Sequence, residues 1–431
     1  MEWRVALGAS KAPNDGDTRS ALLYIGSRGG HPLLWAVDKM KTRLPDNRPM
    51  ETTMTDRKAP KANPIRDSKN RVKLGVFATN GNGAAFTFHP DRFKCTWDAN
   101  VRLAQKAEKL GLEGFVSAAH WKSFGGDDHY SGDLMETFTW AGAVAAVTER
   151  IGIISTVHVT LNHPVFVAKA EATVDLVSNG RAGMNLVLGW YPPDMQLFGY
   201  EVKEHSDRFE LAEEWIHIFD RLWSERKSFD YKGRNYDLKA AFNQPHGVQA
   251  RPVLLNAGRS QRGREFAAKN CDIAFCSAHD PAPEAIKKQV EDYRNEARTK
   301  FCREIQIWMS AYVVLKDTVE EANAYAYDYI VTQGDDAPVQ NIIKNNAIDT
   351  KTMSPEAVEK LAYALKAGFA GYPLVGDADH IAGLFANLSE AGIDGFLLTW
   401  LDYEGGLDRF GREVLPRLER SGLRAPAAAE A

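Results

Sequence analysis

The feature that most constrains this fold is an alternation of apolar, β-branched runs with amphipathic stretches from residue 72 onward. Near-continuous apolar runs separated by helical periodicity are typical of parallel strands that are buried on both faces. Eight such units predict an α/β fold, a (β/α)8 TIM barrel with insertions, and a doubly wound open sheet is the alternative. The predicted strands are 72–78, 114–118, 151–159, 183–188, 252–257, 272–275, 305–315 and 395–399.

Two segments depart from this repeat. Residues 229–238, FDYKGRNYDL, predict a small hairpin around Lys232-Gly233. Residues 332–375 form a long polar excursion, and connections of that length in a compact domain are usually lids or binding loops. Both segments are therefore expected to be insertions in the barrel.

The two ends of the chain lack sustained periodicity. Residues 1–71 predict a disordered extension, of which the polar, basic, proline-bearing part 54–71 is a linker. The barrel is expected over 72–422, and 423–431 is predicted to be a disordered tail. No small-residue cleavage site follows a clean apolar core near the start, so a cytoplasmic location is expected.

Composition excludes several classes of protein. The 53 Lys and Arg residues nearly balance the 57 Asp and Glu residues, which disfavours a nucleic-acid binder. No run of about 18 apolar residues free of charge occurs, so no membrane span is predicted. The four cysteines are too few for a disulfide scaffold and lack the paired spacing of a zinc site, which predicts reduced, buried thiols and no metal.

In a barrel of this kind, functional side chains follow the carboxyl ends of the strands. Asn185 stands out there because an unpaired buried amide costs about 1–3 kcal/mol, so it needs a partner, either backbone or ligand. The AGRS segment 257–260 joins a strand to a helix, and its exposed N–H groups suit a phosphate, although simple capping by Ser260 explains it almost as well.

Several familiar motifs are missing. No GxGxxG follows the first strand and no GxSxG occurs, which disfavours a dinucleotide-binding fold and a serine hydrolase. His158 and His163 straddle a strand end and a loop, and their spacing makes a poor metal pair.

Three blocks resemble the bacterial luciferase-like flavin-dependent monooxygenases. Within them the chain is similar to the two-component group of pyrimidine (uracil ring-opening), dimethylsulfone and alkanesulfonate monooxygenases. The resemblance covers nearly all of 72–422 in family order and implies the (β/α)8 barrel. The blocks are LNHPVFVAKAEATVDLVSNGRAGMNLVLGW (161–190) with EHSDRFELAEEWIHIFDRLW (204–223), VLLNAGRSQRGREFAA (253–268), and AGIDGFLLTWLDYEGGLDRFGREVLPRL (391–418).

The resemblance also implies site residues. Thr156 and Asn185 match a threonine and an asparagine that line the oxygen pocket in members that activate oxygen at the flavin N5 atom, so both are expected to be catalytic. His120 replaces a lysine of the pyrimidine enzymes, Asp194 replaces a glutamate, and Phe209 replaces a tyrosine. The positions expected to bind the flavin are Ala119, His120, Asn185, Asp194, Arg208, Phe209, Gly258 and Ser260.

The implied cofactor is reduced FMN as a co-substrate with O2, and NAD(P)H acts only through a separate NAD(P)H:flavin reductase. The implied substrate is a small pyrimidine-like heterocycle or organosulfur compound that loses a carbon–heteroatom bond, and the implied assembly is a homodimer or homotetramer. Trp190 and the excursion 332–375 are expected to close over the substrate.

Three alternatives remain on the same fold: a desulfonating monooxygenase of the alkanesulfonate or dimethylsulfone type, an F420-type deazaflavin oxidoreductase, and a flavin-binding protein without turnover. Arg259, Arg262 and Arg264 keep the deazaflavin alternative open, since a longer cofactor tail needs a more basic site.

Overall fold

The structure is a computed structural model that describes residues 62–426, apart from 127–128, 202, 259, 277–280 and 346–352, and apart from the side chain of His205. The predicted barrel lies within a compact unit that spans Lys58–Ala431. Most of the predicted extension 1–71 and the end of the predicted tail lie outside the described residues.

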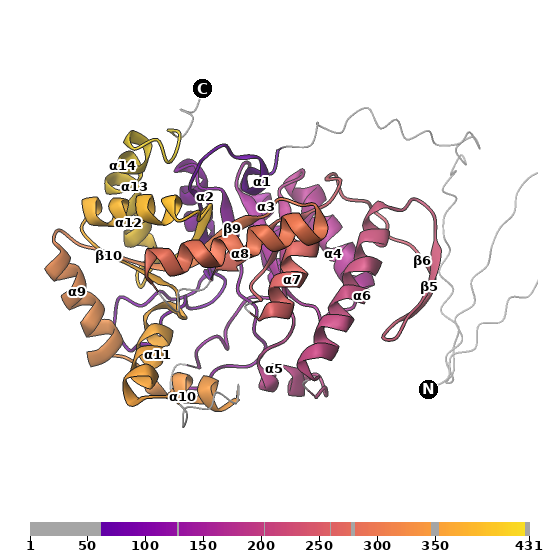
Figure 1. Cartoon of the computed structure of the whole chain (residues 1–431), viewed down its shortest axis with the longest axis horizontal. Helices are drawn as coiled ribbons and strands as arrows, with labels where there is room; N and C mark the ends of the chain where they lie inside the picture. The colour runs from indigo at the N-terminus through magenta and orange to yellow at the C-terminus, as the bar shows by residue number, and fades with distance from the viewer. Residues whose placement is uncertain are drawn as a thin grey trace, which may run out of the picture. The chain divides into compact units, whose positions relative to one another are not determined.

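Eight parallel strands close into the predicted (β/α)8 barrel (Figure 1). Each strand pairs with the next, and β9 pairs with both β8 and β11, which closes the ring. All eight predicted strands are confirmed within a few residues at their ends. They are β1 (Lys73–Phe77), β2 (Gly114–Val116), β3 (Gly152–His158), β4 (Ala182–Val187), β7 (Val253–Asn256), β8 (Ile273–Cys276), β9 (Gln306–Leu315) and β11 (Gly395–Thr399).

A ninth strand, β10 (Tyr372–Gly376), lies inside the excursion that the sequence predicted as a loop. It pairs in parallel with the second half of β9, from Ala311 to Leu315, beyond the part of β9 that pairs with β8. Its five residues include Pro373 and Gly376, which are unusual inside a strand, and this composition hid it.

Helices follow the strands and pack around the barrel (Figure 1). Several begin at a side chain that accepts a hydrogen bond from the first turn, such as Thr96 before α2 and Asp377 before α12. The main helices are α2 (Trp97–Lys109), α3 (Thr137–Ala146), α4 (Pro164–Ser178), α6 (His205–Ser224), α7 (Gln261–Asn270), α8 (Pro283–Phe301), α9 (Val319–Tyr327), α12 (Ala378–Glu390) and α13 (Tyr403–Glu413). The shorter ones are α1 (Pro64–Asp67), α5 (Pro192–Leu197) and α14 (Leu415–Arg420).

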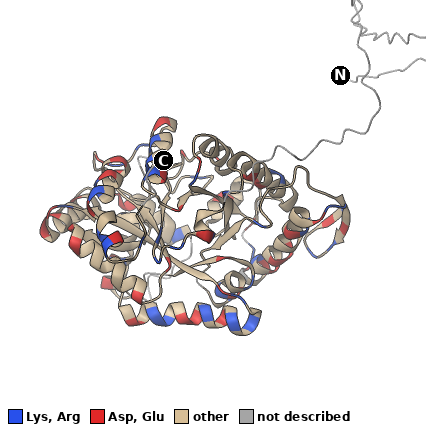
Figure 2. Cartoon of the chain, turned by 90° about the horizontal axis from the view of Figure 1, so that it is seen from above, with Lys and Arg blue, Asp and Glu red and all other residues tan. Residues whose placement is uncertain are grey.

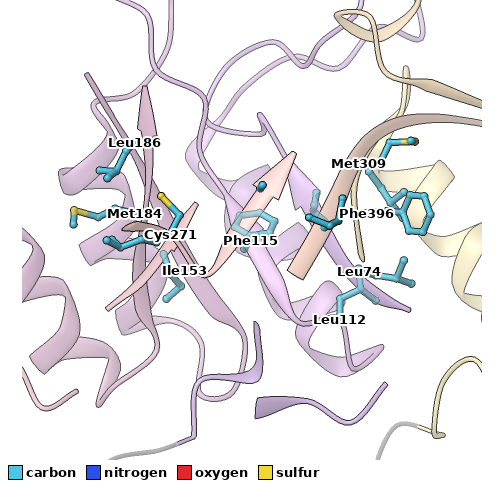
Figure 3. Close-up of a cluster of buried hydrophobic side chains, with 14 of the residues drawn as sticks. Leu74, Leu112, Phe115, Ile153, Met184, Leu186, Cys271, Met309 and Phe396 are labelled. Carbon is cyan, nitrogen blue, oxygen red and sulfur yellow. The ribbon is translucent and has the colours of Figure 1, made fainter. Parts of the chain in front are cut away.

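Strand alternation separates two layers of core. Ile153, Met184 and Phe396 point outward and pack under the helices with Leu74, as Figure 3 shows. Residues one position along, such as Ile154, point inward and fill the barrel axis. Burial on both faces explains why the strands read as unbroken apolar runs.

Residues 62–71 pack on the barrel where its strands begin, so the predicted boundary at residue 71 is too late. Ile65 in α1 is fully buried and joins the cluster that fills the barrel axis. The Asn63 side chain caps α1 and donates to the Ala182 backbone oxygen (3.1 Å). The predicted tail also starts too early, because Leu423 and Arg424 are buried.

The predicted hairpin is confirmed: β5 (Phe229–Lys232) and β6 (Asp237–Ala241) pair in antiparallel register. The predicted long loop is instead largely helical. A short π-helix (Asp328–Thr332) leads into α10 (Asp336–Asn345), and α11 (Pro355–Gly368) precedes β10.

Charged residues of both signs are interspersed along the surrounding helices (Figure 2). No helix among the described residues is long and apolar enough to cross a membrane. The four cysteines are free thiols, as predicted, but only Cys271 and Cys276 are buried, whereas Cys302 is exposed at the left-handed end of α8.

Candidate active site at the carboxyl ends of the strands

Thr156 and Asn185 lie side by side on β3 and β4, in direct register. The Asn185 amide nitrogen donates to the Thr156 hydroxyl (3.2 Å), and that hydroxyl donates to the Ser117 backbone oxygen. The Thr156 N–H in turn donates to the Ser117 hydroxyl (3.0 Å). The chain of bonds fixes both side chains toward the barrel axis, on the inward-facing side of their strands.

The other half of the Asn185 amide is unsatisfied. Its Oδ1 atom is buried and has no hydrogen-bond partner among the described residues. Because Nδ2 is already used by Thr156, the free atom is an acceptor. The described residues thus supply a hydrogen-bond partner for the Asn185 Nδ2 atom but none for Oδ1. The free Oδ1 acceptor suits an N–H group of a ligand.

Asp194 on α5 is fully buried, and its carboxylate accepts hydrogen bonds from the loop after β2. One oxygen accepts from the Trp121 and Lys122 amides (3.0 and 2.7 Å), and the other lies 2.9 Å from His120 Nδ1. Burial alone would raise the pKa of Asp194, but these bonds, led by His120, outweigh it and lower the pKa. The geometry therefore gives Asp194 an indirect part in the site, through His120.

His158 at the end of β3 is the third member of this group. Its Nε2 lies 3.9 Å from the same Asp194 oxygen, and its ring lies 6.2 Å from that of His120. Burial, followed by the charge of His120, lowers the pKa of His158 to about 4 against the pull of Asp194. His163, which the sequence made a poor metal partner for His158, caps α4 by accepting from Val165 N–H (3.2 Å).

Aromatic side chains wall one side of the site. Trp190 and Phe124 pack with Phe369, which follows α11 in the inserted segment. His120 contacts Phe124 edge-on, with ring centroids 4.4 Å apart. The inserted segment is thus packed against the strand-end loops through Phe369. Closure of Trp190 and residues 332–375 over a substrate stays a prediction.

Two cavities open among these residues. One of about 60 Å³ is lined by Ala119, His120, Thr156 and His158, and one of about 270 Å³ is lined by Arg208, Met195 and Tyr236. Ligand pockets usually measure about 300–1,000 Å³, so a flavin-sized molecule enters only if the surrounding loops or side chains move.

Arg208 and Phe209 begin α6 but face different surroundings. Arg208 donates to the Gly189 backbone oxygen (2.9 Å), and its Nε atom is buried without a partner among the described residues. Phe209 is buried in the core against Phe266 and lines neither cavity. The structure keeps Arg208 available for an anion, and the flavin contact of Phe209 stays a prediction.

Gly258 and Ser260 lie between β7 and α7. Ser260 caps α7 by accepting from Gly263 N–H (3.0 Å). A side chain at Gly258 would lie 2.8 Å from the Gly263 Cα atom, so glycine allows this close turn. Of the arginines that favoured a deazaflavin, Arg262 pairs with Glu265 (3.1 Å), and Arg259 lies outside the described residues.

Asn80 and Ser117 are site residues that the sequence argument missed. Asn80, after β1, is fully buried and bonds to both the amide and the carbonyl of Ala118, which holds the chain next to Ala119. Ser117 holds Thr156 in place, because its hydroxyl and its backbone oxygen accept hydrogen bonds from the Thr156 N–H and hydroxyl. The available signal was the same as for Asn185: a small polar residue at the end of an apolar strand.

Comparison with known proteins agrees with this arrangement. The family model described as luciferase-like monooxygenase matches residues 72–395. The pyrimidine monooxygenase RutA of Acinetobacter baylyi is 28% identical over 351 residues, which cover 80% of this chain and 94% of that protein. The RutA protein of Rhizobium rhizogenes is 29% identical over 359 residues, with 81% and 96% covered.

Solved structures share the fold. A riboflavin lyase, RcaE, crystallised with modified FMN and riboflavin, gives a TM-score of 0.74 at 24% identity over 84% of this chain and 94% of that one. DmoA from Hyphomicrobium sulfonivorans gives 0.71 at 22% identity over 84% and 90%.

The closed parallel barrel, the family match and the monooxygenases among the relatives together place the chain in the class of flavin-dependent monooxygenases. The chain belongs to the luciferase-like monooxygenase family. The family resemblance drawn from the sequence is confirmed.

Proposed function

We propose that this chain is a two-component monooxygenase that binds FMN already reduced by a separate NAD(P)H:flavin reductase and uses O2 to oxidise a small pyrimidine-like heterocycle. The single observation that carries the proposal is the Thr156–Asn185 pair with its free, buried acceptor. The pyrimidine monooxygenases among the relatives support the substrate class. The proposed assembly is a homodimer or homotetramer.

The described residues fit a reduced flavin at both ends. The free Oδ1 of Asn185 suits a ring N–H, and the unpartnered Nε of Arg208 suits the phosphate. The amino end of α7, capped by Ser260, is a second group that suits a phosphate. When bound, reduced FMN supplies two electrons to O2. Ala119 and His120 line the cavity that Thr156 also lines, and the rings of Trp190 and Phe124 pack against His120.

Product formation by the purified chain tests the proposal. Reduced FMN with O2 and uracil should give an oxidised product that is absent without the chain, whereas reduced deazaflavin should give none. Hydride transfer with the deazaflavin would favour the F420-type alternative, and flavin binding without turnover for uracil, dimethylsulfone and an alkanesulfonate would favour a binding protein. Turnover of the sulfone or the sulfonate alone would replace the heterocycle by the organosulfur substrate.

A further inference from the structure

The proposed function gives no chemical role to the group formed by His120, Asp194 and His158. It lies at the cavity that Thr156 also lines, and the shared Asp194 oxygen is 2.9 Å from His120 and 3.9 Å from His158. A buried carboxylate between two imidazoles is an arrangement that orients a proton-transferring side chain.

The hydrogen bonds select one tautomer of His120. The Asp194 carboxylate can only accept, so Nδ1 of His120 carries the hydrogen of that bond. No described residue bonds to the Nε2 atom of His120, whose ring lines the small cavity. A neutral His120 therefore presents a free lone pair to the cavity, and a protonated one presents an N–H.

The groups around His120 leave it as the proton carrier. Burial lowers the pKa of His158 to about 4, so His158 is neutral near neutral pH. Burial raises the pKa of Tyr191, whose ring lies 6.0 Å from that of His120. Glu136 also lines the cavity, but its carboxylate caps α3 through the Phe138 and Thr139 amides.

We propose that His120 is the catalytic acid–base of this site and that Asp194 is the positioning residue that leaves His120 Nε2 free toward the cavity. This inference rests on the proposed function, since it assigns the proton transfer in that reaction.

The chemistry requires such a group. When a carbon that carries both a new hydroxyl and a heteroatom collapses to a carbonyl, the hydroxyl loses its proton. The carbon–heteroatom bond breaks, and the heteroatom leaves with the bonding electron pair and gains a proton. A neutral His120 takes the first proton at Nε2 and returns it to the heteroatom, so the imidazole ends as it began.

The first test needs neither cofactor nor substrate. Nitrogen NMR of the chain labelled with ¹⁵N in its histidine rings, assigned through His120→Asn and His158→Asn, reports which nitrogen is protonated. At pH 8 we expect His120 to carry hydrogen on Nδ1 and to lose this preference in Asp194→Asn. Hydrogen on Nε2 in the unaltered chain would overturn the proposal.

The second test separates oxygen uptake from product formation. His120→Asn should still bind and oxidise reduced FMN but release hydrogen peroxide in place of product, with kcat for uracil reduced about 100- to 10,000-fold. Asp194→Asn should move the pH profile of kcat, and Asp194→Glu, which keeps the carboxylate, should restore it. His217→Asn, an exposed histidine on α6, is the matched control and should change nothing.

The outcomes distinguish the two proposals. If the unaltered chain forms no oxidised product with reduced FMN and O2 from uracil, dimethylsulfone or an alkanesulfonate, the proposed function fails, and the NMR result still decides the geometry of His120. If the unaltered chain forms product and His120→Asn forms it equally well, only the acid–base role fails.

Discussion

The two ends of the barrel differ in how completely their buried polar groups are paired. Where the strands begin, the Glu113 carboxylate accepts from the Leu74 amide, from Ser68 and Asn70, and from Arg424. Where the strands end, Asn185 Oδ1 and Arg208 Nε are buried without a partner among the described residues.

This difference separates stability from function within one fold. An unsatisfied buried polar atom costs about 1–3 kcal/mol, and a chain retains such a cost where a ligand relieves it. The paired end contributes to the free energy of folding, and the unpaired end keeps hydrogen-bonding capacity for a ligand. The same division is usual for barrels of this type.

The largest expected effect comes from breaking the paired end. Arg424 is buried and donates to Glu113 (2.8 Å) and to the backbone oxygens of Val72 and Gly111. Arg424→Ala leaves the buried Glu113 carboxylate without its cation, and we expect it to lower the free energy of unfolding by about 3–5 kcal/mol. Denaturant unfolding measures this.

At a temperature where this variant is folded, its kcat should equal that of the unaltered chain. A variant as stable as the unaltered chain would show that residues 423–426 behave as the tail that the sequence predicted.

The second effect should fall on activity alone. Asn185→Leu removes the amide at nearly constant volume, and we expect product formation to fall about 100- to 1,000-fold, as for other single hydrogen-bonding groups at a reacting centre. The melting temperature should not fall, since a buried unsatisfied acceptor is lost along with one bond to Thr156. Single-turnover absorbance with reduced FMN and oxygen measures the activity.

Ser155→Ala is the matched control for this change. Ser155 precedes Thr156 on β3, faces the helices, and also has a buried hydroxyl without a partner among the described residues. Its loss should leave activity intact. Equal activity losses in both variants would mean that the strand, and not its inward face, is what matters.

A smaller effect is expected for the phosphate of the flavin. Arg208→Ala removes a charged donor, and hydrogen bonds to charged groups contribute about 1.5–3 kcal/mol, so FMN affinity should fall about 10- to 100-fold. Riboflavin lacks the phosphate and should bind almost unchanged. Calorimetric titration of both ligands compares them, and equal losses would remove Arg208 from the phosphate site.

The effect that is smallest near pH 5, and that grows as the pH rises, concerns the buried carboxyl group of Glu171 on α4. It is fully buried, both carboxylate oxygens lack partners among the described residues, and burial followed by the nearby Asp175 raises its pKa well above the usual value. The folded chain therefore keeps a proton that the unfolded chain loses above about pH 4.5. Stability should fall with rising pH between these two values, by up to about 1.4 kcal/mol per pH unit.

Glu171→Gln removes the titrating group and should flatten this dependence, so that the variant is more stable than the unaltered chain at pH 8 and similar to it near pH 4.5. Melting temperatures across this pH range measure the difference. The same slope in both proteins would mean that other groups cause it.

The sequence by itself determined the barrel and the first members of its site. Strands buried on both faces are apolar along their whole length, so the eight barrel strands could be predicted as apolar runs. Asn185 could be predicted as a site residue because it is an amide among apolar neighbours. The residues FDYKGRNYDL likewise located the hairpin.

Only the tertiary structure decided which polar groups meet and which remain unpaired. Asp194 and His120 are 74 positions apart, and Glu113 and Arg424 are 311 apart, so no local pattern links them. The sequence analysis missed the burial of Ile65 and the strand β10 for the same reason. Both lie in short segments with little periodicity, and such segments become ordered through contacts with distant parts of the chain. Hydrogen bonds and burial between distant segments arise only when the barrel closes, and closure brings His158 beside Asp194 and leaves the Asn185 acceptor free.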